Sequence, residues 1–201
     1  MKNLFVIIFA CGLLLKFGNS LKIDCDNPES IKEDRIHYCC KHPDGYQEFV
    51  DSCAKETGFK FIKHDEEAIV DITADHAILG TCFAKCIFNK LQFMKGDDLD
   101  MPAVRKHYEG KFKTDPEYAK EMTNAFDHCH SKSIENTAKF LSNPIFHVPG
   151  AKYCDPKPSV ILACVIREFF HNCPADRWAK TEECNTVLEF SKKCKDALTT
   201  I

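Results

Sequence analysis

The chain has 201 residues, of which 44% are hydrophobic and 28% are charged, and its formal net charge is −3 at pH 7. A chain of this length can bury a substantial core within one compact domain. The acidic balance, with no stripe of Lys and Arg, argues against a nucleic-acid partner.

Residues 1–20 have the pattern of a secretory signal peptide. Lys2 supplies a positive charge, residues 4–15 form an apolar run, and Gly18 and Ser20 are small residues suited to cleavage. The apolar run is too short to span a bilayer and no second one follows it, so we expect no membrane span. The sequence therefore predicts a secreted, extracellular protein whose single domain occupies residues 21–201.

The cysteine count fits an oxidising compartment. Cys11 is lost with the signal peptide, which leaves twelve cysteines in the mature chain. Twelve cysteines in a secreted protein predict six disulfides. A cytosolic zinc protein would need C-x-x-C pairs, which the sequence lacks, so neither a metal nor a cofactor is expected. The predicted disulfide residues are Cys25, Cys39, Cys40, Cys53, Cys82, Cys86, Cys129, Cys154, Cys164, Cys173, Cys184 and Cys194.

The first elements in chain order are a polar extension and a helix. Residues 21–43 are irregular, with at most a short helix that opens at Pro28. Asp44 can cap a helix that runs to about Thr57, and Gly58 can end that helix.

Two helices with capping residues follow. Asp75 can cap a helix over about residues 76–93, whose apolar residues and cysteines repeat every three or four positions. Asp100 and Pro102 predict the start of a shorter helix that ends near Phe112.

The second half of the chain also has a helical pattern. Asp115 and Pro116 open a helix, a short one follows at 134–141, and residues 159–173 are apolar almost all round, as in a central buried helix. Thr181 can cap the last helix. No alternating run is long enough to predict a sheet. We therefore predict an all-α, compact bundle of about six to eight short helices locked by six disulfides.

Helix geometry restricts the disulfide pairing without deciding it. Cys82 and Cys86 lie one turn apart with nearly parallel side chains, so each is expected to bond to a different segment. Cys164 and Cys173 are about 13.5 Å apart along a helix, given a rise of ~1.5 Å per residue, so they also need other partners.

The cysteine spacing resembles that of insect odorant-binding proteins. The spacings that carry the resemblance are Cys53-x28-Cys82-x3-Cys86-x42-Cys129 and Cys164-x8-Cys173. Cys154 before this last pair, Pro174 directly after it and Cys184 beyond are similar to the Plus-C branch of the family. The resemblance covers about residues 44–194.

This resemblance implies a disulfide-locked helical carrier (PBP/GOBP-like) for small hydrophobic molecules such as odorants, pheromones or similar semiochemicals. It also implies a core over residues 44–173, with extensions at 21–43 and 174–201. The bridges implied by the family are Cys53–Cys86, Cys82–Cys164 and Cys129–Cys173. Among the other six cysteines, a Cys154–Cys184 bridge is expected.

An odorant pocket is lined mainly by apolar and aromatic side chains, with one or two polar groups. Each candidate can equally be an ordinary core residue, and Tyr153 is either a polar group of the pocket or a surface residue. We expect the stripe of Leu162, Val165, Ile166 and Phe169 to line the cavity. The predicted ligand-binding residues are Phe83, Ile87, Phe93, Phe126, Phe140, Phe146, Leu162, Val165, Ile166, Phe169, Phe170 and Trp178.

Two alternatives compete with an apolar carrier. The string Cys39-Cys40-Lys41-His42 is similar to part of a secreted phospholipase site, but Pro43 follows the histidine and no glycine-rich calcium loop precedes it. Without calcium such a site has no means of stabilising an oxyanion, so we predict no enzyme. The second alternative is a secreted, disulfide-rich interaction or inhibitor module without a small ligand.

The remaining expectations concern partners and pH. A small volatile or lipid-like ligand, a chemosensory receptor and a second copy of the chain are the expected partners. His128, His130 and His147 motivate the hypothesis that protonation between about pH 5 and 6.5 loosens a lid over the ligand.

Overall fold

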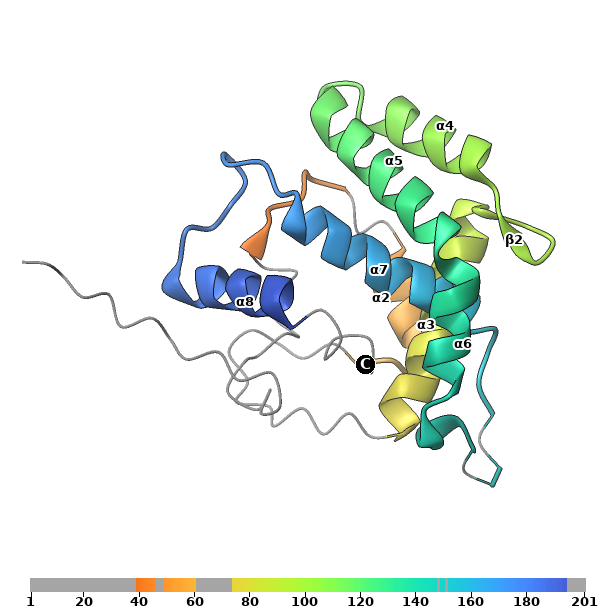
Figure 1. Cartoon of the computed structure of the whole chain (residues 1–201). Coiled ribbons are helices and arrows are strands. Elements are labelled where there is room, and N and C mark those ends of the chain that lie inside the picture. Colours follow the sequence, from red (N-terminus) through yellow and green to blue (C-terminus); the bar gives the residue numbers. More distant parts are fainter. Residues whose placement is uncertain (1–38, 46–48, 61–73, 148, 151, 195–201) are drawn as a thin grey trace, which may run out of the picture.

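The computed structural model describes residues 39–45, 49–60, 74–147, 149–150 and 152–194, and it shows a helical protein (Figure 1). The signal peptide, Cys25 and the possible helix at Pro28 lie outside these residues. The helices confirm the predicted all-α fold. They are α2 (Val50–Thr57), α3 (Ala74–Leu91), α4 (Met101–Lys111), α5 (Pro116–Ser131), α6 (Ser133–Leu141), the 3-10 helix η3 (Pro144–His147), α7 (Lys157–His171) and α8 (Glu182–Lys193).

Three helices begin where their capping residues predict. The Asp100 carboxylate accepts a hydrogen bond from the Ala103 amide at 3.2 Å, which caps α4. Asp115 accepts one from the Tyr118 amide at 3.1 Å at the start of α5. Thr181 caps α8 in the same way. Each cap satisfies an amide that the first helical turn leaves without a partner.

Helix α2 begins later than predicted. It starts at Val50 rather than after Asp44, and Phe49 precedes it without a side-chain cap. Gly58 ends the helix with a left-handed φ of 75°, as predicted, because glycine adopts this conformation without strain.

A two-stranded hairpin between α3 and α4 was not predicted. Strands β1 (Met94–Lys95) and β2 (Asp98–Leu99) pair antiparallel around Gly96, whose φ is 64°. Leu99 is buried and attaches the hairpin to the core. Each strand has only two residues, too few for an alternating pattern to be visible in the sequence.

Helix α7 lies at the centre of the molecule. It packs against α3, α5 and α6, while α4 lies on the far side of α5 and α2 packs on α3. In Figure 1, α4 and α5 form one end of the molecule and α8 lies near the opposite end of α7. Among the described residues, no helix is both long and apolar enough to cross a membrane.

Five disulfides join pairs of described residues, and Cys194 is disulfide-bonded as well. The pairs are Cys39–Cys184, Cys40–Cys173, Cys53–Cys86, Cys82–Cys154 and Cys129–Cys164. The Cys53–Cys86 bridge is confirmed. Helix α3 also bonds to two different segments, as its geometry predicted.

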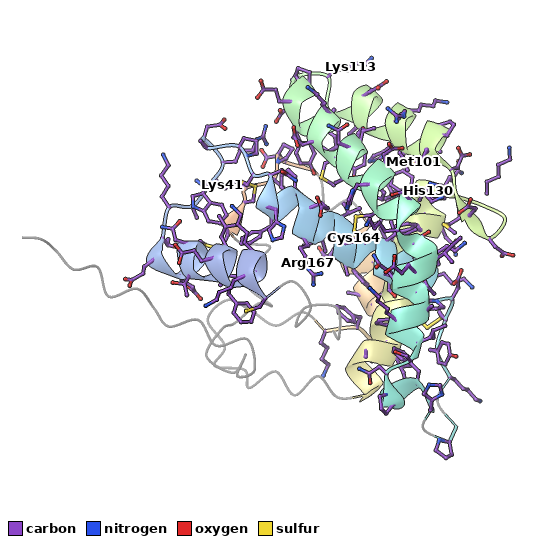
Figure 2. The ribbon with its side chains drawn as sticks, viewed as in Figure 1. Lys41, Met101, Lys113, His130, Cys164 and Arg167 are labelled. Atoms are coloured by element: carbon purple, nitrogen blue, oxygen red, sulfur yellow. A yellow bond between two sulfur atoms is a disulfide. The ribbon has the colours of Figure 1, made fainter. Side chains whose placement is uncertain are left out.

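The predicted Cys82–Cys164 bridge is wrong. Cys82 bonds to Cys154, whose amide donates to the Thr81 hydroxyl at 3.0 Å, so the segment before α7 lies directly on α3. Cys164 lies in the middle of α7 beside α5, where it bonds to Cys129 (Figure 2).

The predicted Cys129–Cys173 and Cys154–Cys184 bridges are also wrong. Cys154-x9-Cys164 and Cys164-x8-Cys173 have nearly equal spacing, and the core bridges use the first pair. Cys173 is then left for Cys40. Cys184 bonds to Cys39.

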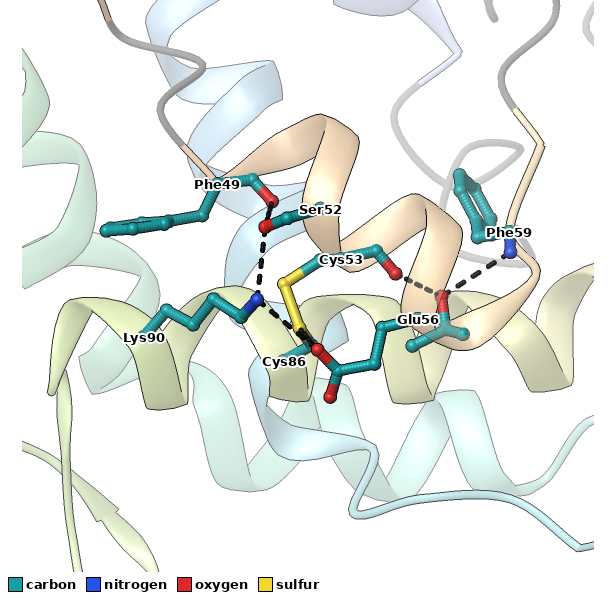
Figure 3. The surroundings of a disulfide bond; sticks show 8 residues. Phe49, Ser52, Cys53, Glu56, Phe59, Cys86 and Lys90 are labelled. Atoms are coloured by element: carbon teal, nitrogen blue, oxygen red, sulfur yellow. Dashed lines mark hydrogen bonds and ion pairs between the residues drawn. A yellow bond between two sulfur atoms is a disulfide. The ribbon is translucent and has the colours of Figure 1, made fainter.

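The Cys53–Cys86 bridge lies within a polar contact between α2 and α3 (Figure 3). The Lys90 ammonium donates to the Ser52 hydroxyl at 3.0 Å and lies 3.3 Å from the Glu56 carboxylate. These exposed contacts fix the two helices on one side of the disulfide.

The two extensions meet in what we call the terminal junction, formed by residues 39–41 and 177–179. The Lys41 amide donates to the Arg177 carbonyl at 3.0 Å, and the Ala179 amide donates to the Cys39 carbonyl at 2.9 Å. Together they form an antiparallel bridge between Cys40 and Trp178. The Cys40–Cys173 disulfide joins the N-terminal extension to the segment directly after α7, and the Cys39–Cys184 disulfide joins the two extensions to each other.

Candidate ligand-binding site

An apolar cluster fills the space between α3, α4, α5 and α7, and it gathers much of the predicted ligand-binding set. We call it the central cluster. Its buried members from that set are Phe83, Ile87, Phe93, Phe126, Val165 and Phe169, and Leu162 packs against it while partly exposed. Four helices and the disulfides of α3 and α5 therefore position these side chains.

Aromatic rings run through the central cluster in continuous contact. Phe93 meets Phe126 edge-on, with ring centroids 5.5 Å apart, and Phe126 lies 5.7 Å from Tyr108. Tyr108 continues to Tyr118 at 6.1 Å, and Tyr118 meets Phe169 edge-on at 5.5 Å. These distances are typical of favourable aromatic pairs.

Sequence reasoning missed several rings of this cluster. Phe88, Tyr108, Phe112 and Tyr118 are all buried in it. Tyr118 lies four residues before Met122, an apolar residue that is buried in the same cluster, so the helical period would have found it. Burial also raises the pKa of Tyr108 far above its ordinary value, so this phenol stays neutral.

His42 joins the central cluster from the N-terminal extension. Its ring stacks on Phe169 with centroids 4.5 Å apart, and Nδ1 lies 3.1 Å from the Tyr118 hydroxyl. The histidine of the string Cys39-Cys40-Lys41-His42 is thus packed among aromatic rings. The neighbour of its Nδ1 atom is the Tyr118 phenol.

The other predicted residues lie elsewhere. Phe170 packs with Trp178, 5.3 Å between ring centroids, in a second cluster beside the terminal junction. Phe140 and Phe146 form a third group with Tyr153, which is 41% exposed. The structure therefore divides the predicted set into three groups and leaves Ile166 outside them, exposed on α7.

One flank of α7 carries apolar side chains from the central cluster to the surface. Leu162 is partly buried, and Ile166, one turn later, is 36% exposed. A hollow of about 360 Å³ also opens between α4 and α5, and none of the predicted ligand-binding residues lines it.

The sequence of this helical, disulfide-rich protein matches a protein-family model. Residues 47–190 match the model described as AgamOBP47-like, which covers well over half of the chain. The chain belongs to this family of odorant-binding proteins. The predicted resemblance to Plus-C insect odorant-binding proteins is thereby confirmed.

The chain is similar in sequence to three odorant-binding proteins of Anopheles gambiae. General odorant-binding protein 67 is 24% identical over 174 residues, which cover 85% of this chain and 78% of that protein. Odorant-binding protein 47 is 30% identical over 122 residues, 57% of this chain and 52% of that protein. General odorant-binding protein 68 is 22% identical over 177 residues, which cover 87% of this chain and 76% of that protein.

Two histidines of this odorant-binding protein lie beside carboxylates. His130 is 2.9 Å from Asp98 in the hairpin, and His128 is 3.8 Å from Glu168 on α7. The hydrogen bond with His130 is the main cause that lowers the pKa of Asp98. Protonation of either histidine adds an attraction at these positions, the reverse of the loosening hypothesised from the sequence.

Proposed function

We propose that this protein is a secreted carrier that binds small hydrophobic molecules (odorants, pheromones or similar semiochemicals) and transports them through extracellular fluid. The observation that carries the proposal is membership of the odorant-binding family. It is supported by a central cluster that is apolar, aromatic and continuous with a partly exposed flank of α7.

The disulfides explain how such a protein can exchange core contacts for ligand contacts. A core held only by packing loses stability when its side chains separate to admit a guest. Here the Cys53–Cys86, Cys82–Cys154 and Cys129–Cys164 bridges join α3 and α5 to their neighbours independently of that packing. The helices can therefore keep their arrangement while side chains between them rearrange.

We place the ligand entrance at the exposed flank of α7. A molecule that enters beside Leu162 and Ile166 meets Val165 and Phe169, which lie on the same helix and belong to the central cluster. Phe83 and Ile87 of α3 belong to the same cluster. The proposed pocket is apolar, so its ligands are recognised by shape and apolar surface.

A fluorescent apolar probe tests this proposal. Oxidised mature protein titrated with N-phenyl-1-naphthylamine should show saturable binding of roughly micromolar strength, typical of a ligand that buries most of its apolar surface. Ile166→Gln should weaken binding several-fold because it places an amide at the entrance. The absence of saturable binding would favour the alternative, a secreted interaction or inhibitor module.

Ile134→Gln is the matched control. Ile134 is 80% exposed on α6 and belongs to no described apolar cluster, so its substitution removes the same apolar surface at a distance from the proposed pocket. Equal loss of affinity in the two variants would contradict the proposed entrance. Delivery to a chemosensory receptor and homodimer formation stay predictions, and light scattering of the purified protein tests the second.

A further inference from the structure

The hollow between α4 and α5 has a buried, largely apolar floor. Phe112, Ala119 and Thr123 line it, and all three side chains are buried. The Thr123 hydroxyl donates to the Ala119 carbonyl at 2.7 Å, so its polar group is satisfied within α5. The floor is therefore apolar, and the Thr123 hydroxyl already has its hydrogen-bond partner within the helix.

The rim of the same hollow is cationic. Arg105, Lys113 and Lys120 line it with exposed side chains, and Glu109 is the only carboxylate among its described lining residues. Lys113 lies at the turn that joins the two helices (Figure 2). Arg105 also pairs with Asp127 at 3.7 Å, so the two lysines supply most of the uncompensated charge.

This local charge is opposite to that of the whole chain. The protein has a formal net charge of −3, whereas the rim holds three cations against one carboxylate. A cationic rim above an apolar floor complements a molecule with one anionic end and one apolar end. The volume of about 360 Å³ lies at the small end of the range for sites that hold a single small molecule.

We propose that the α4–α5 hollow is a second binding site, selective for an apolar carboxylate such as a medium-chain fatty acid anion. The apolar tail lies on Phe112 and Ala119, and the carboxylate lies between Lys113 and Lys120. Phe112 and Ala119 belong to the central cluster, so the hollow opens on the side of that cluster that faces α4 and α5, and neither Leu162 nor Ile166 lines it. The hollow differs in chemistry from the pocket proposed beside α7, because that pocket selects apolar surface whereas the hollow also selects negative charge.

Dodecanoate and dodecanol distinguish the two kinds of site. Dodecanoate added to the ¹⁵N-labelled, oxidised mature protein should shift the amide resonances of Phe112, Ala119 and Thr123 saturably. Dodecanol, which lacks the charge, should shift them much less. Raising the salt concentration should weaken the dodecanoate-induced shifts, since the charges involved are exposed.

Three variants test the charge argument. Lys113→Gln with Lys120→Gln should weaken dodecanoate binding at the hollow roughly fivefold to tenfold, the effect expected for two exposed ion pairs. Glu109→Gln should strengthen it. The control, Lys95→Gln with Lys106→Gln, removes the same charge from exposed positions that do not line the hollow and should change little.

Equal affinities in the test and control double variants would overturn the proposal, as would dodecanoate shifts confined to Phe83, Ile87, Val165 and Phe169, the cluster residues of the proposed pocket beside α7. The outcome is independent of the carrier proposal, because N-phenyl-1-naphthylamine is neutral. That probe should bind the Lys113→Gln, Lys120→Gln variant as it binds the unmodified protein. Probe binding without dodecanoate shifts at the hollow would refute the second site alone.

Discussion

The guanidinium of Arg177 pairs with the carboxylate of Asp115, the residue that caps helix α5. One oxygen of Asp115 accepts from the Tyr118 amide and the other from Arg177. The guanidinium carbon also lies 5.5 Å from the centre of the Tyr118 ring. The terminal junction is therefore connected to the start of α5, at the edge of the central cluster.

Arg177→Gln should lower the free energy of unfolding by roughly 1–2 kcal/mol, because the charge-assisted bond is lost while the helix cap remains. Both side chains are mostly buried, so solvent screens this pair less than a surface pair. Urea denaturation measures the change. Arg105→Gln, which removes an exposed pair with Asp127, should cost less than about 1 kcal/mol. Equal losses in the two variants would contradict the interpretation.

The same pair predicts a dependence of stability on pH. The hydrogen bond from Arg177 is the main cause that lowers the pKa of Asp115 below its ordinary value of 3.8. In acid the unfolded chain takes up a proton at this position before the folded protein does. The stabilisation should therefore be complete above that ordinary value and be lost as pH falls through the lower, folded pKa. Unfolding measured from pH 2 to 7 should show a shallower acid limb in Arg177→Gln than in Arg105→Gln.

The hairpin should not loosen between pH 7 and pH 5. Asp98 keeps its charge over this range because its pKa is lowered, and a protonated His130 attracts it more strongly than a neutral one. The Asp100 amide donates to the Phe93 carbonyl beside the hairpin at 2.7 Å and reports on its opening. The hydrogen-exchange rate of the Asp100 amide, corrected for the intrinsic rate at each pH, should be equal or slower at pH 5 than at pH 7. Faster exchange at pH 5, absent in Asp98→Asn, would instead support the hypothesis that protonation loosens a lid.

Removal of the Cys40–Cys173 bridge should separate the two halves of the terminal junction. Cys40→Ser with Cys173→Ser should cost roughly 2–4 kcal/mol, the usual effect of losing a native disulfide. Hydrogen exchange should accelerate at the Lys41 and Ala179 amides, whose bonds form the junction. The Ala103 amide, bonded to Asp100 far from this bridge, is the internal reference and should change less.

Peptide mapping without reduction tests the disulfide frame itself. Cys194 is disulfide-bonded, and the five bridges among the described residues leave Cys25 as the remaining cysteine of the mature chain. We therefore expect a linked peptide pair that contains Cys25 and Cys194. Recovery of Cys82 linked to Cys164 would contradict the bridges described above.

Three helix starts were predictable because they depend on local chemistry, whereas α2 begins later than Asp44 predicts and α3 already includes Asp75. Asp100, Asp115 and Thr181 each cap a helix through a bond to an amide three residues later. Apart from Cys53–Cys86, the disulfide pairs were not predictable, since two nearly equal spacings compete and only the packing of α7 against α5 and α3 decides between them. Tertiary contacts far apart in the sequence determine that packing.

The candidate site was only partly predictable for a related reason. Phe169 and Phe170 are neighbours in the sequence, but successive residues on a helix point about 100° apart. Phe169 therefore enters the central cluster and Phe170 the second one. His42 could not be assigned to the site from sequence, because the Cys40–Cys173 bridge, which joins its segment to the end of α7, was not among the predicted pairs.

The way the bridges cross the exposed turn at Pro149 and Gly150 has a consequence for proteolysis. Of the five disulfides between described residues, four join a residue before this turn to a residue after it, and the Cys53–Cys86 bridge lies wholly before it. A protease that hydrolysed the peptide bond between Pro149 and Gly150 would produce two polypeptides still held together by sulfur. The nicked molecule would migrate as one species until a reductant was added.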